Sequence, residues 1–431
     1  MNPSFCRATK HFAHQRTEND CMTRSNALSP RSIAAHLCAA ALMLLLLWMP
    51  LGRSLAPWLA WIVITLLICG LLINRFTLAV RVRHMPLLMA FAASSVCSAW
   101  LSPFSEISLR RGASGFLLML VFPAAQLIAA NARALMLVRR TMLAAILLCA
   151  LDIAWQYAFG RSMLLGVAAP VDRYRYSGSL ANPNEVAFIA LLLPLALCNA
   201  DTTRAKSTRV LSIALACFGV LLTSSRTTLG GMFVGANVNS WFGTRRFLKW
   251  SLAIALAVSA VAWIGDFGSF RKRVGETLHP QDEIRLQTWR IAFDAFVERP
   301  LLGQGPAVFF EVNEASRKLP QIQGRETPAG GMPWVHNIAL ELLTERGVIG
   351  AALFAALVIA IICDLRRGLA SVATRKWSAA LAASLATFAA MSMLDLSLLK
   401  DWCSVCLWLS AGFAASVAQQ NSEEPQGVRA D

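Results

Sequence analysis

Long apolar runs recur along the whole chain, and they constrain its fold more than any other feature. A bilayer core requires roughly 20 apolar residues per helical span, and the sequence supplies such a run about a dozen times. Only 15% of the residues are charged and 56% are hydrophobic, whereas a soluble protein carries about 25% charged residues. The sequence therefore predicts an all-α polytopic membrane protein with about 12 transmembrane helices.

Charged residues, prolines or glycines bound each run. The predicted spans cover residues 33–49, 54–74, 85–101, 115–131, 141–159, 185–200, 208–223, 227–242, 248–266, 348–365, 377–396 and 402–418. Residues 1–31 are polar and basic and lack the apolar region of a signal peptide, so we expect a disordered cytosolic tail. The organisation that follows is spans 1–9 within 32–266, one large, partly helical loop at 267–347, spans 10–12 within 348–418, and a second cytosolic tail at 419–431.

Basic residues fall in alternate short connections and form no continuous stripe, so the net charge of +16 does not indicate a nucleic-acid partner. Sixteen Lys and Arg residues lie in or next to one set of connections, and eight lie in the five short connections on the other side. The richer set comprises residues 75–84, 132–140, 201–207, 243–247 and 366–376. Because cytosolic loops carry the excess of Lys and Arg, we expect these connections and both termini to be cytosolic and residues 267–347 to be periplasmic.

The polar motifs then face away from the cytosol, toward the periplasmic side. That side of the membrane has no ATP. Arg173 and Arg175 lie in the 160–184 connection, Arg226 lies in the 224–226 turn, and Arg285 and His336 lie in the large loop. Any reaction at these residues must start from a substrate that is already activated. Such a set of cations and a base suits displacement of a pyrophosphate leaving group from a lipid.

Arg226 follows Ser224 and Ser225 in a tight turn and opposes the usual charge bias of an outer boundary. One interpretation is an arginine that extends to lipid headgroups. The other is a guanidinium that binds a lipid-linked phosphate, whose oxygens match its planar fork. Both interpretations stay open from the sequence.

The loop segment 282–298 has helical periodicity. Its predicted buried stripe comprises Arg285, Thr288, Trp289, Ala292, Phe293 and Phe296. A cation on that stripe requires an anionic partner, either a protein carboxylate or a ligand phosphate. Arg290 lies off the stripe with Asp294 four residues later, which favours an ordinary surface ion pair.

His336 is one of two histidines in the large loop, with His279. Its imidazole can accept a proton near neutral pH, although a hydrogen-bonded histidine that caps a helix is the alternative. Upstream, the 182–185 segment reads Asn-Pro-Asn-Glu before a span. Helix capping is the favoured role there, with Asn184 and Glu185 as alternative contacts for sugar hydroxyls. The Gly303–Gly305 turn is likewise favoured as structural over anion binding.

Three motifs in this order resemble the O-antigen ligase and polymerase superfamily of membrane glycosyltransferases. They are Arg226 in its Ser-Ser-Arg turn, Arg285-x-x-x-Trp289 followed by Pro300-Leu-Leu-Gly-x-Gly305, and His336-Asn337-x-x-Leu-Glu341. The resemblance implies an inverting transfer of a glycan from undecaprenyl diphosphate to a hydroxyl acceptor, at the periplasmic face of a Gram-negative inner membrane. For a ligase the acceptor is a sugar of the lipid A–core oligosaccharide.

The resemblance also implies roles for individual residues. His336 would be the base or orienting residue for the acceptor hydroxyl, and Arg226 and Arg285 would hold the diphosphate. Further candidates for substrate contact are Arg290, Arg173, Arg175, Asn184, Glu185, Trp289 and Asn337. No metal and no cofactor is expected, because the outer loops have no paired-Asp motif and no His/Cys cluster.

Three other functions are compatible with the same residues. An O-antigen polymerase would use a second lipid-linked glycan as the acceptor, and a protein O-oligosaccharyltransferase would glycosylate a protein. Protein-directed enzymes typically carry a larger C-terminal outer domain, whereas this chain ends 13 residues after the last predicted span. A glycolipid transporter would favour charges deep within the spans, where only Asp152 and Asp395 are candidates.

Overall fold

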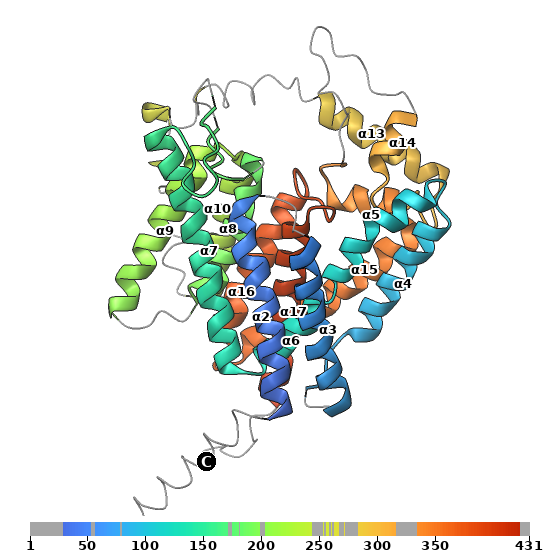
Figure 1. Cartoon of the computed structure of the whole chain (residues 1–431), viewed down its shortest axis with the longest axis horizontal. Coiled ribbons are helices and arrows are strands. Elements are labelled where there is room, and N and C mark those ends of the chain that lie inside the picture. Colours follow the sequence, from blue (N-terminus) through green and yellow to red (C-terminus); the bar gives the residue numbers. More distant parts are fainter. Residues whose placement is uncertain are drawn as a thin grey trace, which may run out of the picture.

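The computed structural model describes residues 29–52, 57–77, 80–170, 175–180, 182–198, 203–243, 283–315 and 334–422, together with a few positions between 253 and 271. The regular structure in these ranges is helical, apart from one isolated bridge between Arg161 and Ala168. Figure 1 shows long helices gathered into one bundle, with α13 and α14 beside one of its ends. The all-α fold predicted from the sequence is confirmed.

The longer helices are α2 (Pro30–Trp48), α3 (Pro57–Thr77), α4 (Met85–Trp100), α5 (Ser105–Leu118), α6 (Val121–Ala129), α7 (Ala132–Phe159), α8 (Ala187–Ala196), α9 (Thr203–Thr223), α10 (Arg226–Phe242), α13 (Glu283–Glu298), α15 (Ile338–Ala370), α16 (Arg375–Ser392) and α17 (Asp401–Ser422). Shorter elements are η1 (Met49–Leu51), η2 (Pro183–Val186) and α14 (Phe309–Ala315). Six segments of the described part are long and apolar enough to cross a membrane. More than half of the predicted span 248–266 lies outside the described residues.

Three helices begin well before the spans predicted for them. α7 begins at Ala132 rather than at residue 141, and α15 begins at Ile338 rather than at residue 348. The predicted span 115–131 is divided between α5, which begins at Ser105, and α6. In each case the first turns carry charged residues, which the search for apolar runs excluded. Helix length and membrane-span length therefore differ at these three positions.

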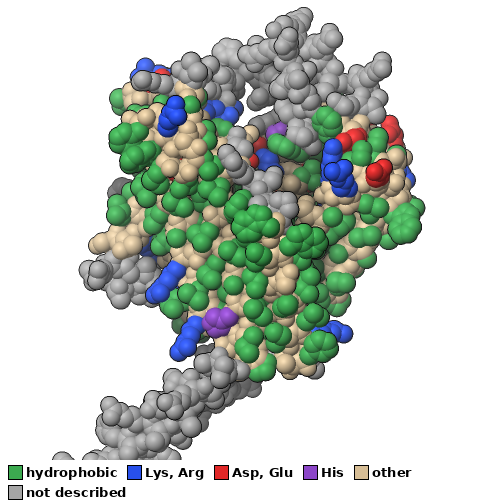
Figure 2. All heavy atoms as spheres, viewed as in Figure 1, with side chains coloured by type: hydrophobic (Ala, Val, Ile, Leu, Met, Phe, Trp, Pro, Cys, Tyr) green, Lys and Arg blue, Asp and Glu red, His purple; other side chains and the backbone are tan. Residues whose placement is uncertain are grey.

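The centre of the bundle is α17, which packs against α6, α15 and α16. Small residues allow the close approach that membrane helices use for packing. A Cβ at Gly412 would lie 2.3 Å from the carbonyl oxygen of Phe122, so α17 and α6 are in backbone contact. Figure 2 shows hydrophobic side chains over the sides of the bundle. A buried centre and an apolar outer surface are what a lipid environment requires.

α15 is interrupted at Gly347, whose φ and ψ are 63° and −170°. In a continuous helix, the amides of Val348 and Ile349 would bond the carbonyls of residues 344 and 345. Here the turn 300–305 supplies the partners on both sides of the break. Gln304 and Gly305 donate to the carbonyls of residues 344 and 345 at 2.8 and 2.9 Å. Val348 and Ile349 donate to the carbonyls of Pro300 and Leu301 at 2.8 and 3.2 Å.

Serines of α4 and of the start of α5 cover the same turn. Ser98 Oγ lies 2.5 Å from the carbonyl of Leu302 and 2.7 Å from that of Glu345, and Ser108 Oγ donates to the carbonyl of Pro306 at 2.7 Å. The two amides of the Gly303–Gly305 turn that face α15 are thus occupied by helix carbonyls. The structural interpretation of this turn fits the contacts, and anion binding by those amides does not.

Hydrogen bonds also show which connections share an end of the bundle. Arg83 bonds Asp364 at 2.8 Å, Arg139 donates to the carbonyl of Leu195 at 3.0 Å, and Arg375 donates to that of Phe242 at 3.2 Å. We call this the basic end. Four of the five predicted cytosolic connections, 75–84, 132–140, 201–207 and 366–376, thus lie at or next to it, and α10 also ends there.

The break in α15 predicts a sharp sensitivity at one residue. A Cβ at Gly347 would lie 2.3 Å from the carbonyl oxygen of Leu301, on a backbone with positive φ. We expect Gly347→Ala to destabilise the fold by at least about 2 kcal/mol, measured as the melting temperature of the purified protein in detergent.

Gly115→Ala is the matched control, because a Cβ there meets nothing within 4 Å in a helix. Its stability should be unchanged or higher by up to about 1 kcal/mol. Equal melting temperatures for the two variants would contradict the account of the break.

Candidate functional site

His336 and Asp395 meet at the end of the bundle opposite the basic end. His336 lies in the segment 334–337 that leads into α15, with a φ of 58°, and Asp395 lies in the segment 393–400 between α16 and α17. The imidazole Nδ1 lies 3.2 Å from Asp395 Oδ1. The side chains are 13% and 3% exposed, so both are largely shielded from water.

The contact fixes which imidazole nitrogen is available. Trp334 Nε1 lies 3.3 Å from the same Nδ1, and one nitrogen cannot accept that bond while donating to Asp395. The carboxylate is the stronger partner because its hydrogen bond is charge-assisted. With its hydrogen on Nδ1, the imidazole presents Nε2 as a proton acceptor.

Asn337 joins the same two segments. Its Oδ1 accepts from the amide of Leu340 at 3.1 Å and so caps α15, while its Nδ2 donates to the carbonyl of Met393 at 3.3 Å. The side chain that the sequence suggested as a substrate contact is thus occupied by two structural bonds. It holds His336 beside Asp395.

Lys400 adds a cation to this pair. Its Nζ lies 4.6 Å from the centre of the Trp334 ring, within the range of a cation–π contact. The ring of Trp334 in turn lies 5.6 Å from that of His336. Sequence reasoning did not assign Asp395 or Lys400 to the site, because they are about 60 residues from His336 along the chain.

Arg175 organises a second group of predicted residues. Its Nε donates to the carbonyl of Thr223 at 3.3 Å, and its Nη2 donates to Asn184 Oδ1. The next amide, of Tyr176, donates to the carbonyl of Leu222 at 3.1 Å. The 175–180 segment, η2 and the end of α9 are therefore bound together. Asn182 is the residue that caps η2, accepting from the amide of Asn184 at 2.9 Å.

Arg226 is the first residue of α10 and is half-buried. α10 and α16 pack through small residues: a Cβ at Gly235 would meet Thr387 and Ala383, and one at Gly231 would meet Met391 and Thr387. The two helices are therefore antiparallel, and about one more helical turn along each brings Arg226 level with Asp395. The second group thus lies at the same end as the His336–Asp395 pair. We call this end, with residues 175–185, 223–226, 334–337 and 393–400, the loop end.

α13 contacts the segment that carries His336. Trp289 Nε1 donates to the carbonyl of Val335 at 3.1 Å, and Thr344 Oγ1 donates to that of Ala292 at 2.9 Å. Figure 2 shows a hollow at this end of the molecule, between the α7–α10 group and the α13–α14 group of Figure 1, with charged side chains and a histidine inside it.

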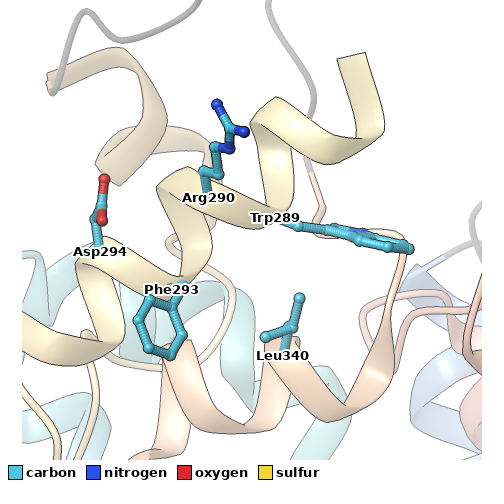
Figure 3. Close-up of a pocket in the computed structure, with 5 residues that line it drawn as sticks. All are labelled: Trp289, Arg290, Phe293, Asp294 and Leu340. Carbon is cyan, nitrogen blue, oxygen red and sulfur yellow. The ribbon is translucent and has the colours of Figure 1, made fainter. Parts of the chain in front are cut away.

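The buried face of α13 differs from the predicted stripe. Thr288, Ile291, Ala292 and Ala295 are buried, whereas Phe293 is 53% exposed. Arg290 is exposed, and no ion pair joins it to Asp294 among the described contacts. Figure 3 shows the two side chains extending separately from α13, so the predicted surface pair is not among the described contacts. The side chain of Arg285 and the whole of Arg173 lie outside the described residues.

Glu185 lies in η2, which packs against both α9 and α10. Glu185 therefore lies near the turn between these two helices, where Arg226 begins α10. The structure therefore brings Arg175, Asn184, Glu185 and Arg226 to one side of the loop end, and Trp289 and Arg290 to the other. The His336–Asp395 pair lies in the segments between these helices. Cations beside an anion-stabilised base suit a reaction in which a hydroxyl loses a proton while negative charge develops on a leaving group.

Comparison with known proteins bears on this arrangement. Residues 211–355 match the family model described as O-Antigen ligase, and this segment includes Arg226, α13 and His336. The match confirms the resemblance seen in the motifs and supports a membrane glycosyltransferase of the O-antigen ligase and polymerase kind. No curated protein matches the chain.

One solved structure is similar in part, in work entitled "Structural coordination of polymerization and crosslinking by a peptidoglycan synthase complex". Its chain is 17% identical with a TM-score of 0.43, and the alignment covers 78% of this chain and 97% of that chain. At that TM-score the likeness does not establish a shared fold.

The His336–Asp395 contact generates a prediction. Asp395→Asn keeps the size of the side chain but removes the charge that stabilises a protonated imidazole. We expect glycosyl transfer to slow by at least about 10-fold, and by no more than the roughly 10²–10⁴-fold that general-base catalysis contributes. The measurement is turnover at saturating donor.

Because Asp395 acts through the imidazole, Asp395→Asn combined with His336→Ala should be no slower than His336→Ala alone. Glu106→Gln, at an exposed carboxylate of α5, is the control and should retain normal turnover. Rate losses that multiply in the double variant would show that Asp395 does not work through His336.

Proposed function

We propose that this protein, whose residues 211–355 match the O-antigen ligase family model, is an O-antigen ligase. It transfers a polysaccharide from undecaprenyl diphosphate to a sugar hydroxyl of the lipid A–core oligosaccharide. The observation that carries the proposal is the His336–Asp395 pair at the level of Arg226. At that level the base takes the proton of the acceptor hydroxyl, and the cation stabilises the leaving diphosphate in the same displacement reaction.

The reaction is assigned to the periplasmic face of a Gram-negative inner membrane. Arg83, Arg139 and Arg375 lie at the basic end, and the positive-inside rule makes that end cytosolic. The loop end is then periplasmic, with the two termini in the cytosol. An activated lipid-linked donor fits this compartment because its diphosphate ester supplies the driving force without ATP.

The donor diphosphate is assigned to Arg226, at the start of α10. Arg285, whose side chain lies outside the described residues, is proposed as a second contact from the motif resemblance alone. Arginine suits this role because its planar guanidinium binds phosphate oxygens in pairs. Arg175 serves differently, because its guanidinium is already bonded to Asn184 and to the carbonyl of Thr223. It holds the turn from which Arg226 extends.

Transfer then proceeds in one displacement with inversion. His336 Nε2 takes the proton of the acceptor hydroxyl as its oxygen forms a bond to the anomeric carbon. The bond from that carbon to the diphosphate oxygen breaks, and its electron pair leaves with the diphosphate. Asp395 remains ionised and stabilises the imidazolium, and the arginines offset the charge that develops on the leaving group.

The proposal is tested with purified protein in EDTA and without nucleotide. Lipid-linked polysaccharide is supplied as the donor, and three acceptors are offered separately: lipid A–core glycolipid, a second lipid-linked glycan, and an unmodified pilin. We expect product with lipid A–core alone, because a clamp made of arginines requires neither metal nor ATP.

Each other result has a defined meaning. Transfer only to the second lipid-linked glycan would contradict the ligase and identify a polymerase, and transfer only to the pilin would identify a protein-directed enzyme. Activity lost in EDTA and restored by Mg²⁺ or Mn²⁺ would contradict the arginine clamp.

A further inference from the structure

A pocket of about 340 Å³ lies between α13 and the first turn of α15. Trp289, Phe293 and Leu340 face this gap, and Arg290 and Asp294 extend along the outer side of α13 (Figure 3). Its size is at the lower end of the range for small-molecule sites. The lining combines two aromatic rings, one cation and one carboxylate.

α13 divides into three faces, and the pocket lies where two of them meet. One face is buried against α15 and α14. A second is apolar but exposed, and includes Phe293 and Val297, which are 53% and 58% exposed, and continues to Leu301 at 66%. The third is polar and exposed, with Arg290, Asp294 and Glu298. An exposed apolar face beside a polar face is the pattern of helices that lie at a membrane–water interface.

The position of the pocket relative to His336 is fixed by one bond. Trp289 Nε1 donates to the carbonyl of Val335, the residue before His336. Leu340, in the first turn of α15, lines the same pocket. A molecule bound there is beside the base and on the side away from α10, where Arg226 begins its helix.

From these contacts we propose that the α13 pocket is the binding subsite for a sugar ring of the acceptor glycolipid. The inference rests on the proposed function, because it deepens the account of the same active site. Sugar rings present apolar C–H faces that pack on aromatic rings, and hydroxyls that bond charged side chains. Phe293 and Trp289 supply the rings, and Arg290 and Asp294 supply a donor and an acceptor.

Because the pocket adjoins an exposed apolar face, we expect an amphiphilic acceptor to bind there rather than a free sugar. The acyl chains of a glycolipid would lie along the exposed apolar face at Val297 and Leu301, and its saccharide would enter the pocket from there. Inversion requires the acceptor oxygen to approach from the side opposite the leaving diphosphate. A pocket on α13 and an arginine at the start of α10, with His336 between them, meet that requirement.

The test measures the dependence of transfer rate on acceptor concentration for Phe293→Ala and Arg290→Ala. The acceptor is lipid A–core glycolipid without O-antigen, and donor affinity is measured separately. Removing binding energy that is equal in the ground and transition states raises KM and leaves kcat in place, so we expect KM for the glycolipid to rise by about 5- to 20-fold with kcat within about 2-fold. Donor affinity should not change.

Val372→Ala is the matched control, since it shortens an exposed apolar side chain in the 366–376 connection at the basic end, away from the pocket and from the apolar face of α13. Binding of the glycolipid without donor is measured in parallel, and Phe293→Ala should weaken it by a similar factor. An unchanged acceptor KM in both pocket variants, with normal transfer by the wild type, would overturn the subsite alone. Lower donor affinity in both would assign the pocket to the donor and also overturn it.

The failure of the proposed function has a different signature. In that case wild-type protein transfers nothing to lipid A–core, whatever happens at the pocket. Loss of co-purified phospholipid in Phe293→Ala, with glycolipid binding and KM unchanged, would identify a membrane-lipid contact and would likewise overturn the inference.

Discussion

The exchange of hydrogen bonds between the turn 300–305 and the interrupted α15 is the constraint on which the loop end depends. A helix broken near a membrane leaves two carbonyls and two amides that water cannot reach, and each must find a partner in the protein. The turn supplies all four. Because α13 leads directly into this turn, its position against α15 follows from the same bonds, and with it the pocket at Trp289 and Phe293.

Buried polar side chains of the first part of α15 support the segment that carries the base. Glu341 Oε1 accepts from the amide of Leu398 at 2.9 Å, which ties α15 to the connection that contains Asp395 and Lys400. Arg346, which is 5% exposed, donates to Ser95 Oγ at 3.2 Å and to Glu345 at 3.3 Å. Together with the cap by Asn337, these bonds fix His336 relative to Asp395. A general base requires this kind of preorganisation, because a small displacement of the base costs a large part of the rate.

Much of the fold could be predicted from apolar runs. The ends of five helices lie within a few residues of the predicted span ends: α2, α3, α4, α16 and α17. Charged residues at helix ends caused the errors in the predicted starts, as in α7 and α15. These helices extend beyond their apolar spans into turns that carry charged side chains. The order of the motifs placed Arg226 and His336 in a common site, which is consistent with the contacts around them. What sequence could not supply was pairing at long range: Asp395 beside His336, Lys400 over Trp334, and Asn184 bonded to Arg175.

The buried face of α13 illustrates the same limit on a smaller scale. Arg285, Trp289 and Phe293 recur at helical spacing, but the face that α15 covers is rotated toward Ile291 and Ala295. The partner helix decides which stripe is buried, and a single sequence does not contain that partner's position. The exposed aromatic ring that results is what makes a pocket of this region.

The central claim is that donor diphosphate and His336 occupy opposite sides of one centre at the loop end. It is tested most directly by an experimental structure of the protein with a non-transferable phosphonate analogue of an undecaprenyl diphosphate glycan. The account predicts that phosphate oxygens are bonded to the Arg226 guanidinium, with the first sugar between the diphosphate and His336 Nε2. A diphosphate bound at the basic end, beside Arg83 and Arg375, would contradict it.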